Sequence, residues 1–266
     1  MRHFLLGVLL CMLGTSTLAA QESDSIVMEV FRQKGYPFYE DNEVKLLPTG
    51  REKYDDLFAC VRSARDFIHM DYFKFQQDSI CHALFDILAG KAREGVEVRI
   101  VYDSFGNRFS DLPLRKPYLD SLRAAGIRIE EFDRVRFPWI NHLRHRNHHK
   151  IAVIDGEVAY TGGMNVADYY LRGKPRVGEW RDMHMKVHGP MVNGYERVFE
   201  DMWWRTTKER LDSTRYLSTA HCDGHTKMAM VERVPKKSGK AIRETYCIAI
   251  DNAQHIIQII NPYATL

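Results

Sequence analysis

Apolar residues along most of the chain follow two spacings, one typical of short buried strands and one typical of amphipathic helices. The helical spacing is clearest in residues 52–65, where Tyr54, Leu57, Phe58 and Val61 share one stripe. The expected strands are 44–47, 67–73, 96–102, 127–132, 151–154, 158–161 and 183–187, and the expected helices are 52–65, 80–94, 116–125 and 190–204. Strands and helices alternate, which predicts an α/β fold with a mixed sheet and helices on both of its faces.

The last third of the chain predicts two turns and a partial repeat. Residues 211–225 are polar and aperiodic, as in a loop, and 235–240 predict a further turn. A helix over 242–252 and a strand over 256–260 are then expected. Their apolar positions match those of the earlier helix–strand pair at a constant offset. The pattern therefore predicts one complete repeat and the start of a second.

The first 20 residues have the pattern of a signal peptide. Arg2 and His3 form a short positive region, 4–14 are apolar, and 17–20 offer small residues for cleavage. An uncleaved membrane anchor is the alternative, although the apolar stretch is short for a span. Either reading predicts export, to the periplasm or to a membrane surface.

Composition is typical of a globular domain and identifies no binding partner. The chain of 266 residues is 45% hydrophobic, which is enough for the core of one large domain, and its net charge is only +3. Four cysteines remain after the predicted cleavage, at spacings typical of no disulfide framework. Cys60 and Cys81 lie on apolar helix faces, which favours buried free thiols.

Basic residues are locally dense between 134 and 150. Arg134 and Arg136 are followed by Phe137 and Trp139. Such a loop suits contact with an anionic lipid surface, and it would also suit single-stranded nucleic acid or remain a solvated loop. We expect Arg134, Arg136, Phe137 and Trp139 to contact a membrane.

The strongest chemical signal precedes the strand expected at 151–154. His148 and Lys150 are two residues apart, so both side chains project from the same side of an extended backbone. An imidazole can attack phosphorus, and an ammonium can neutralise the charge of the non-bridging oxygens. The pair therefore predicts a site for a phosphate diester.

A turn and a glycine-rich segment complete this pattern. Asp155 and Gly156 form a turn signal between two expected strands. Gly162 and Gly163 would let the backbone approach a ligand closely, and Asn165 adds an amide donor. A metal site is the alternative for the histidines at 142, 145, 148 and 149, but no cysteine or carboxylate cluster completes a tetrahedral set there.

The spacing His-x-Lys, four residues, Asp, six residues, Gly-Gly-x-Asn resembles the signature of the phospholipase D superfamily. Gly163 stands where many members have serine. The runs 70–75, 95–106, 146–150, 162–170 and 180–184, together with Gly189-Pro190 and 261–263, resemble the bacterial cardiolipin synthase branch. The resemblance implies a domain plan of signal peptide 1–20, lead-in 21–41, catalytic domain 42–210 with its motif at 148–165, linker 211–240, and a truncated second domain 241–266.

The resemblance also implies roles for individual residues. His148 would form a phosphohistidine, aided by Lys150 and Asn165, and a histidine of a second motif would protonate the leaving group. Asp182 matches the carboxylate that orients the nucleophile, although a surface ion pair with Arg181 is the alternative. Asp155 belongs to the motif and is expected to support the structure rather than to transfer protons. Arg146, Asn147, Gly162 and Gly163 would contact the substrate, with no metal or cofactor required.

These implications predict a phosphatidyltransferase that uses phosphatidylglycerol at a membrane surface. One alternative is a secreted phospholipase D or nuclease-type phosphodiesterase that shares its site in a homodimer. Nucleic acid is the less expected substrate. A second alternative is an inactive fragment that only binds lipid, because the motif occurs once in this sequence.

Overall fold

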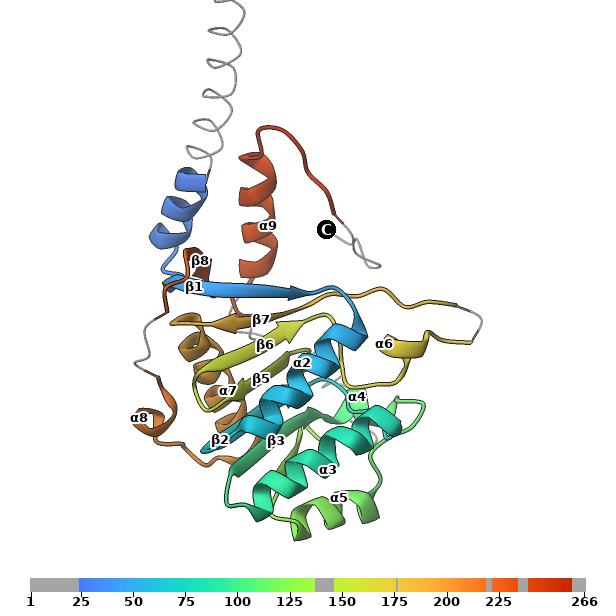
Figure 1. Ribbon diagram of the computed structural model, residues 1–266. Helices are drawn as coiled ribbons and strands as arrows, with labels where there is room; N and C mark the ends of the chain where they lie inside the picture. The colour runs from blue at the N-terminus through green and yellow to red at the C-terminus, as the bar shows by residue number, and fades with distance from the viewer. Residues whose placement is uncertain (1–23, 137–145, 176, 219–221, 234–238, 260–266) are drawn as a thin grey trace, which may run out of the picture. The chain divides into compact units, whose positions relative to one another are not determined.

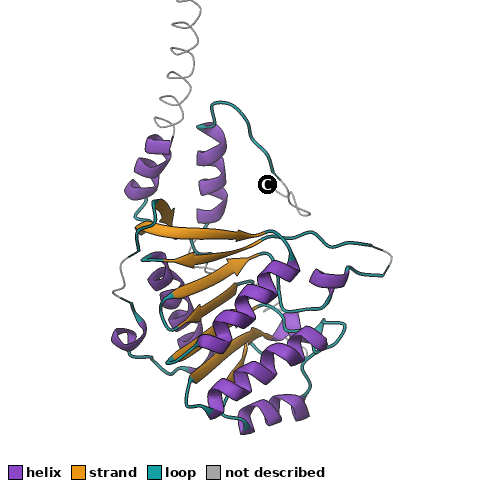
Figure 2. Ribbon diagram, in the orientation of Figure 1, coloured by secondary structure: helices purple, strands orange, loops and turns teal. Residues whose placement is uncertain are grey.

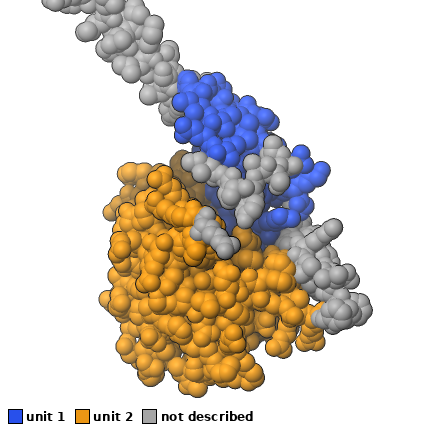
Figure 3. Space-filling view, turned by 90° about the vertical axis from the view of Figure 1, so that its right-hand side faces the viewer, with its two compact units in different colours: residues 1–38, 229–266 blue, residues 39–228 orange. Residues whose placement is uncertain are grey.

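The computed structural model describes residues 24–136, 146–175, 177–218, 222–233 and 239–259. The chain divides into two compact units, residues 39–228 and residues 1–38 with 229–266, which Figure 3 colours separately. The expected signal peptide, Phe137 and Trp139 lie outside the described residues. Within the described part, no helix is both long enough and apolar enough to cross a membrane.

The larger unit is built on a mixed sheet of eight strands (Figure 1). The strands are β1 (Phe38–Leu47), β2 (Phe67–Tyr72), β3 (Glu97–Asp103), β4 (Arg128–Phe132), β5 (Lys150–Ile154), β6 (Val158–Gly162), β7 (His184–His188) and β8 (Thr226–Ala229). Their order across the sheet is β4-β3-β2-β5-β6-β7-β1-β8. β2, β3 and β4 are parallel, whereas β5, β6, β7 and β1 continue from β2 with antiparallel pairing.

Helices cover both faces of this sheet, as the sequence predicts (Figure 2). The longer ones are α2 (Gly50–Ser63), α3 (Ser79–Arg93), α5 (Lys116–Ala124) and α7 (Met191–Thr207). Leu57 of α2 and Leu84 of α3 join one core with Ile68 and Met70 of β2. His69 of β2 points the other way and stacks on Phe199 of α7, with the ring centroids 4.3 Å apart. The alternation of side chains along β2 therefore serves two cores, which explains why all six of its residues are buried.

Helix α2 begins where the sequence provides a cap. The Thr49 hydroxyl accepts the backbone N–H of Glu52 and donates to its carboxylate at 2.6 Å. Thr49 is therefore a side-chain N-cap, which satisfies the backbone N–H of Glu52, while the Glu52 carboxylate orients the capping hydroxyl. The same residues fix where α2 starts, and α2 carries two residues that reach the functional site.

Several short elements were not expected from periodicity. They are α4 (Ser104–Arg108), α6 (Tyr169–Arg172), α8 (Ser213–Tyr216) inside the expected loop, and strand β8. β8 adds to the sheet beside β1, where Asn42 donates its side-chain amide to the Thr226 carbonyl at 3.1 Å. Such elements are stabilised by distant neighbours, so short windows of sequence do not reveal them.

The smaller unit contains a helix at residues 24–33 and α9 (Ala241–Asp251), the latter as expected. The strand predicted at 256–260 was wrong for its described part, because 256–259 form neither helix nor strand. Ile256 and Ile259 are 76% and 60% exposed. A strand needs a partner for its backbone hydrogen bonds, and these residues have no strand beside them among the described residues.

Candidate active site

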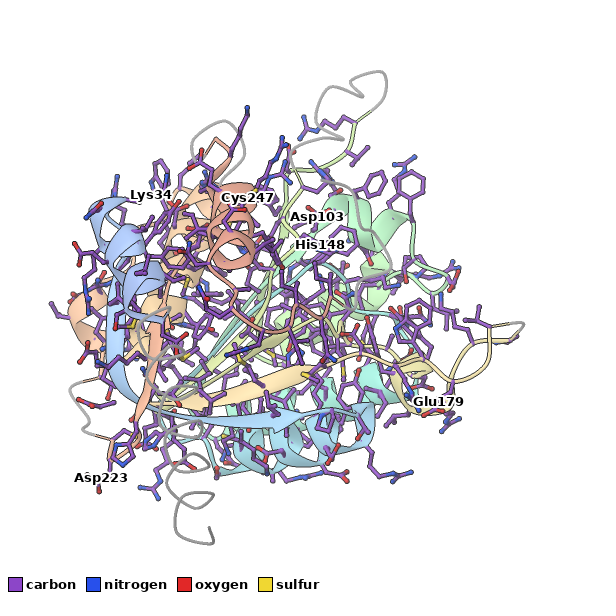
Figure 4. The ribbon with its side chains drawn as sticks, turned by 90° about the horizontal axis from the view of Figure 1, so that it is seen from above. Lys34, Asp103, His148, Glu179, Asp223 and Cys247 are labelled. Atoms are coloured by element: carbon purple, nitrogen blue, oxygen red, sulfur yellow. The ribbon has the colours of Figure 1, made fainter. Side chains whose placement is uncertain are left out.

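The His-x-Lys motif enters the sheet at the start of β5. The backbone N–H of Phe73 donates to the His149 carbonyl at 2.9 Å, which extends the pairing of β2 with β5 up to the motif. Asp103, at the end of β3, accepts the backbone N–H of Asn147 at 2.8 Å. Figure 4 labels His148 and Asp103 in this part of the molecule. The ends of three neighbouring strands therefore hold the motif in place.

His148 lies at the surface with one side of its ring against the protein. The ring packs on Phe73 with centroids 4.8 Å apart. Desolvation, followed by repulsion from Lys150 and His149, lowers the pKa of His148 to about 4. The ring is therefore neutral at physiological pH, and a neutral imidazole has the free electron pair that a nucleophile needs.

Lys150 projects to the same side as His148, as the alternation predicts. Its ammonium lies 5.4 Å from the centroid of the Phe73 ring and donates to the His148 carbonyl at 2.8 Å. Burial lowers the pKa of Lys150 to about 8, opposed by the charges of Asp182 and Asp71. Between about pH 4 and pH 8, a neutral His148 therefore stands beside a charged Lys150.

His149 projects to the opposite face of the sheet, as expected. Its Nδ1 lies 3.0 Å from a carboxylate oxygen of Asp71. Asn147 donates its amide to the same carboxylate and accepts the backbone N–H of His149 at 3.0 Å. Arg146 pairs with Asp133 and lies 3.6 Å from Asp103. The expected substrate contacts Arg146 and Asn147 thus have bonds within the protein that orient the motif.

The glycine-rich segment is shaped by β7 and the residues before it. Gly162 has a φ of +151°, and a Cβ there would lie 2.5 Å from the Met183 carbonyl oxygen. A Cβ on Gly163 would collide with the Asp182 carboxylate. Both glycines are required here by close packing within the protein. A serine at 163, as in many family members, would need Asp182 to move.

Asp182 lies against Gly163, and its charge acts on the motif lysine, Lys150. Its Oδ1 accepts the backbone N–H of Met183 at 2.7 Å. Burial raises its pKa, while Met183, Lys150 and Lys53 act to lower it. The charges that act on His148 are those of Lys150 and His149, so orientation of His148 by Asp182 remains a prediction.

Two residues of α2 hold the Asn165 segment, and sequence reasoning missed them. Lys53 is fully buried and donates to the carbonyls of Met164 and Asn165 at 3.0 and 2.9 Å. The Tyr54 hydroxyl accepts the backbone N–H of Ala167 at 3.0 Å and contacts the Asn165 carbonyl at the same distance. Burial lowers the pKa of Lys53 well below its ordinary value. Its position in the sequence resembles that of an exposed helix lysine, so no local signal reveals it.

His184 is a second residue that sequence reasoning did not assign to the site. It pairs with Gly162 across β6 and β7 and is 1% exposed. Neither ring nitrogen has a hydrogen-bond partner within the described structure. Burial, with repulsion from Lys53 and Lys150, lowers its pKa well below 6.5. Its position two residues after Asp182 was the sequence feature that could have suggested a place in the site.

Asp155 lies at the other end of β5 from Lys150. Its carboxylate accepts the backbone N–H groups of residues 65, 66 and 67 at 2.8 to 2.9 Å. It also begins the turn to β6, with a φ of +53° followed by +66° at Gly156. These contacts tie the end of β5 to the start of β2, and Asp155 lies at the far end of β5 from His148 and Lys150.

Comparison with known proteins identifies the class of this fold and site. A family model described as cardiolipin synthase, phospholipase D-like domain, matches residues 57–203, more than half of the chain. The chain therefore belongs to the phospholipase D-like family of the cardiolipin synthase type.

Individual relatives agree with this assignment. A cardiolipin synthase of Listeria monocytogenes serotype 4a is 33% identical over 94% of this chain and 56% of its own length. One from Staphylococcus aureus strain Mu50 is 35% identical over 84% of this chain and 45% of its own length. The chain thus spans about half the length of the curated relatives it matches.

A solved structure shares the fold. The phosphatidylserine synthase of Haemophilus influenzae has a TM-score of 0.53 and 13% identity, covering 89% of this chain and 48% of that one. This likeness agrees with the mixed sheet and flanking helices described above.

The collision at Gly163 leads to a prediction for Gly163→Ser. The added side chain should displace the Asp182 carboxylate and lower the unfolding free energy by about 1–3 kcal/mol. Urea unfolding of both proteins measures the difference. Gly90→Ser is the matched control, because a Cβ on Gly90 of α3 meets nothing within 4 Å. Equal stability of Gly163→Ser and the starting protein would contradict this account of the glycine.

Proposed function

We propose that this chain carries one catalytic half of a phosphatidyltransferase of the cardiolipin synthase type. The observation that carries the proposal is the neutral His148 beside the charged Lys150, both packed on Phe73. The relatives' names agree with it. A phospholipid such as phosphatidylglycerol is the proposed donor and acceptor.

In the proposed reaction, a ring nitrogen of His148 attacks the phosphorus of the donor lipid. A P–N bond forms, the P–O bond to the alcohol breaks, and the alkoxide takes a proton from a general acid. Lys150 and the Asn165 amide stabilise the charge on the non-bridging oxygens. A second alcohol then attacks the phosphohistidine and releases His148. In the net reaction, one P–O bond to an alcohol breaks and another P–O bond to an alcohol forms, so the transfer needs no energy source and no cofactor.

The remaining regions of the chain receive proposals of the same kind. We propose that 1–20 directs export, that 42–210 is the catalytic domain, and that 211–240 links it to the start of a second repeat at 241–266. The helix α9 has no buried residue among those described, and Tyr246 is 57% exposed. Tyr246 corresponds in the repeat to Leu57, which α2 buries in its core. This correspondence supports a proposal that a second repeat packs against the exposed apolar side of α9.

A substrate comparison tests the proposed function. The chain, together with a protein that supplies the second motif, is incubated with phosphatidylglycerol vesicles or with single-stranded DNA. We expect cardiolipin and glycerol from the lipid, identified by mass spectrometry, and no cleavage of the DNA. Cleavage of DNA without lipid turnover would instead favour the nuclease-type homodimer and overturn the proposal.

Membrane contact by the segment before the motif is the second testable part. Arg134 is 69% exposed in its side chain, and Arg136 is also exposed. Each arginine near an anionic surface contributes about 1 kcal/mol. Replacing both with alanine should therefore weaken binding to anionic vesicles by roughly 30-fold. Sedimentation with vesicles measures the affinity.

The control removes the same charge elsewhere. Arg62 of α2 and Arg93 of α3 are exposed, and their joint replacement with alanine should leave vesicle affinity unchanged. Binding of the unchanged chain should fall as salt rises. Equal losses in the two double variants would show that net charge alone, rather than this segment, governs membrane contact.

A further inference from the structure

Three side chains with different metal-ligating atoms converge at one end of the sheet, outside the site described above. They are Glu43 of β1, His188 of β7 and Cys222, which precedes β8. A carboxylate oxygen, a ring nitrogen and the thiol sulfur all lie within 4.8 Å of one another. Cys222 is 5% exposed, whereas Glu43 is exposed and His188 is half-buried. The cluster thus has a buried end and a solvent-facing end.

The fold brings these residues together from distant parts of the sequence. Glu43 and His188 are direct cross-strand partners in the antiparallel pair of β1 and β7. Cys222 reaches them because its segment passes close to β1. A Cβ on Gly224 would lie 2.5 Å from the Glu43 backbone nitrogen and would collide with the Asn42 carbonyl. Glycine at 224 therefore permits the close approach that places the thiol beside the strand pair.

We propose that Glu43, His188 and Cys222 form a Zn²⁺ site with a fourth position open to solvent. Sulfur, imidazole nitrogen and carboxylate oxygen are the three ligand types that proteins use for zinc. In tetrahedral coordination these atoms would lie about 3.5 Å apart, so a contraction of about 1 Å closes the site. The exposed Glu43 side chain can make that movement. Magnesium and calcium prefer all-oxygen sites and suit this set poorly.

The site is separate from the phosphodiester chemistry. His184 at the start of β7 pairs with Gly162, and His188 is four residues further along the strand, or about 13 Å. In Figure 4, Asp223, the residue after Cys222, lies well away from His148. A bound ion would join β1, β7 and the segment that leads into β8. We therefore infer that the ion would stabilise the β8 edge of the sheet.

Metal binding can be measured without any activity. Chelator-treated, reduced protein is titrated with Zn²⁺ against a chromophoric indicator, and with Co²⁺ to record the thiolate-to-metal charge-transfer band. We expect one Zn²⁺ per chain with a Kd below about 10 μM, a Co²⁺ spectrum with thiolate character, and a higher Tm in zinc. Excess Mg²⁺ should not compete.

Matched variants locate the ion. Cys222→Ser and His188→Ala should each weaken zinc binding at least tenfold and abolish the Tm increase, and Cys222→Ser should also remove the charge-transfer band. Cys247→Ser and His82→Ala replace an exposed cysteine and an exposed histidine elsewhere, and both should bind as the parent does. A Kd above about 10 μM, or unchanged binding in Cys222→Ser, would overturn the site. Circular dichroism confirms that each variant is folded.

Discussion

Replacing His148 with alanine should abolish attack on phosphodiesters, with a loss of about a thousandfold or more in turnover. The reason is structural as well as chemical. Lowering of its pKa to about 4 leaves His148 neutral, and packing on Phe73 fixes its ring beside Lys150. Alanine would leave Lys150 able to bind a phosphate with no group to attack it.

The measurement should isolate nucleophilic attack from protonation of the leaving group. Bis(p-nitrophenyl) phosphate serves, because nitrophenolate is a stable anion and leaves without a general acid. We expect the chain to release nitrophenolate and to form a phosphohistidine that is stable in base and labile in acid. His148→Ala should do neither. Lys150→Ala should be similarly slow, because the transition state loses its nearest positive charge.

A histidine outside the site is the control for this experiment. His82 lies exposed on α3, and its ring makes an edge-to-face contact with Tyr118, away from the motif residues. His82→Ala should therefore keep its full rate. Retention of more than about a tenth of the activity in His148→Ala would refute the assignment of the nucleophile.

The second large effect concerns the proton donor for lipid substrates. Acting as a monomer on phosphatidylglycerol, the 266-residue chain should be about a hundred- to ten-thousand-fold slower than when a second His-x-Lys motif is supplied. An alkoxide is a poor leaving group and needs a proton in the transition state. His149 cannot provide it, because its ring pairs with Asp71 on the opposite face of the sheet.

Complementation tests this requirement. The chain is mixed with the C-terminal half of a related cardiolipin synthase, or with the same half after its motif histidine is changed to alanine. Only the intact half should raise lipid turnover, whereas nitrophenolate release should be similar in the two mixtures. Light scattering establishes the mass of each species. A monomer that converts phosphatidylglycerol quickly by itself would show that the proton donor lies within this chain.

Much of the fold could be predicted from local patterns. The strands of the sheet from β1 to β7 and the four longer helices were expected, because each buries an apolar face with a regular period. The placement of the His148 and Lys150 side chains on the same side of the strand was also predictable, since alternation along an extended backbone is a local property. The predicted strand at 256–260 was wrong in its described part, because apolar residues alone do not provide a neighbour for hydrogen bonding.

The support of the site could not be predicted in this way. Lys53 reads as a solvent-facing helix lysine, yet it is buried and holds two carbonyls more than 100 residues further along the chain. Gly163 reads as a flexible residue, yet its role is to leave room for Asp182. Both depend on which segments meet after folding.

The sequence by itself determined the class of fold and the family and predicted His148 as the nucleophile, since all three follow from the spacing of neighbouring residues. Only the tertiary structure decided that His149 pairs with Asp71, that Arg146 and Asn147 orient the motif, and that Glu43, His188 and Cys222 meet. The physical reason is that periodicity records the face of each element, whereas desolvation and charge depend on contacts between elements that are distant in the chain.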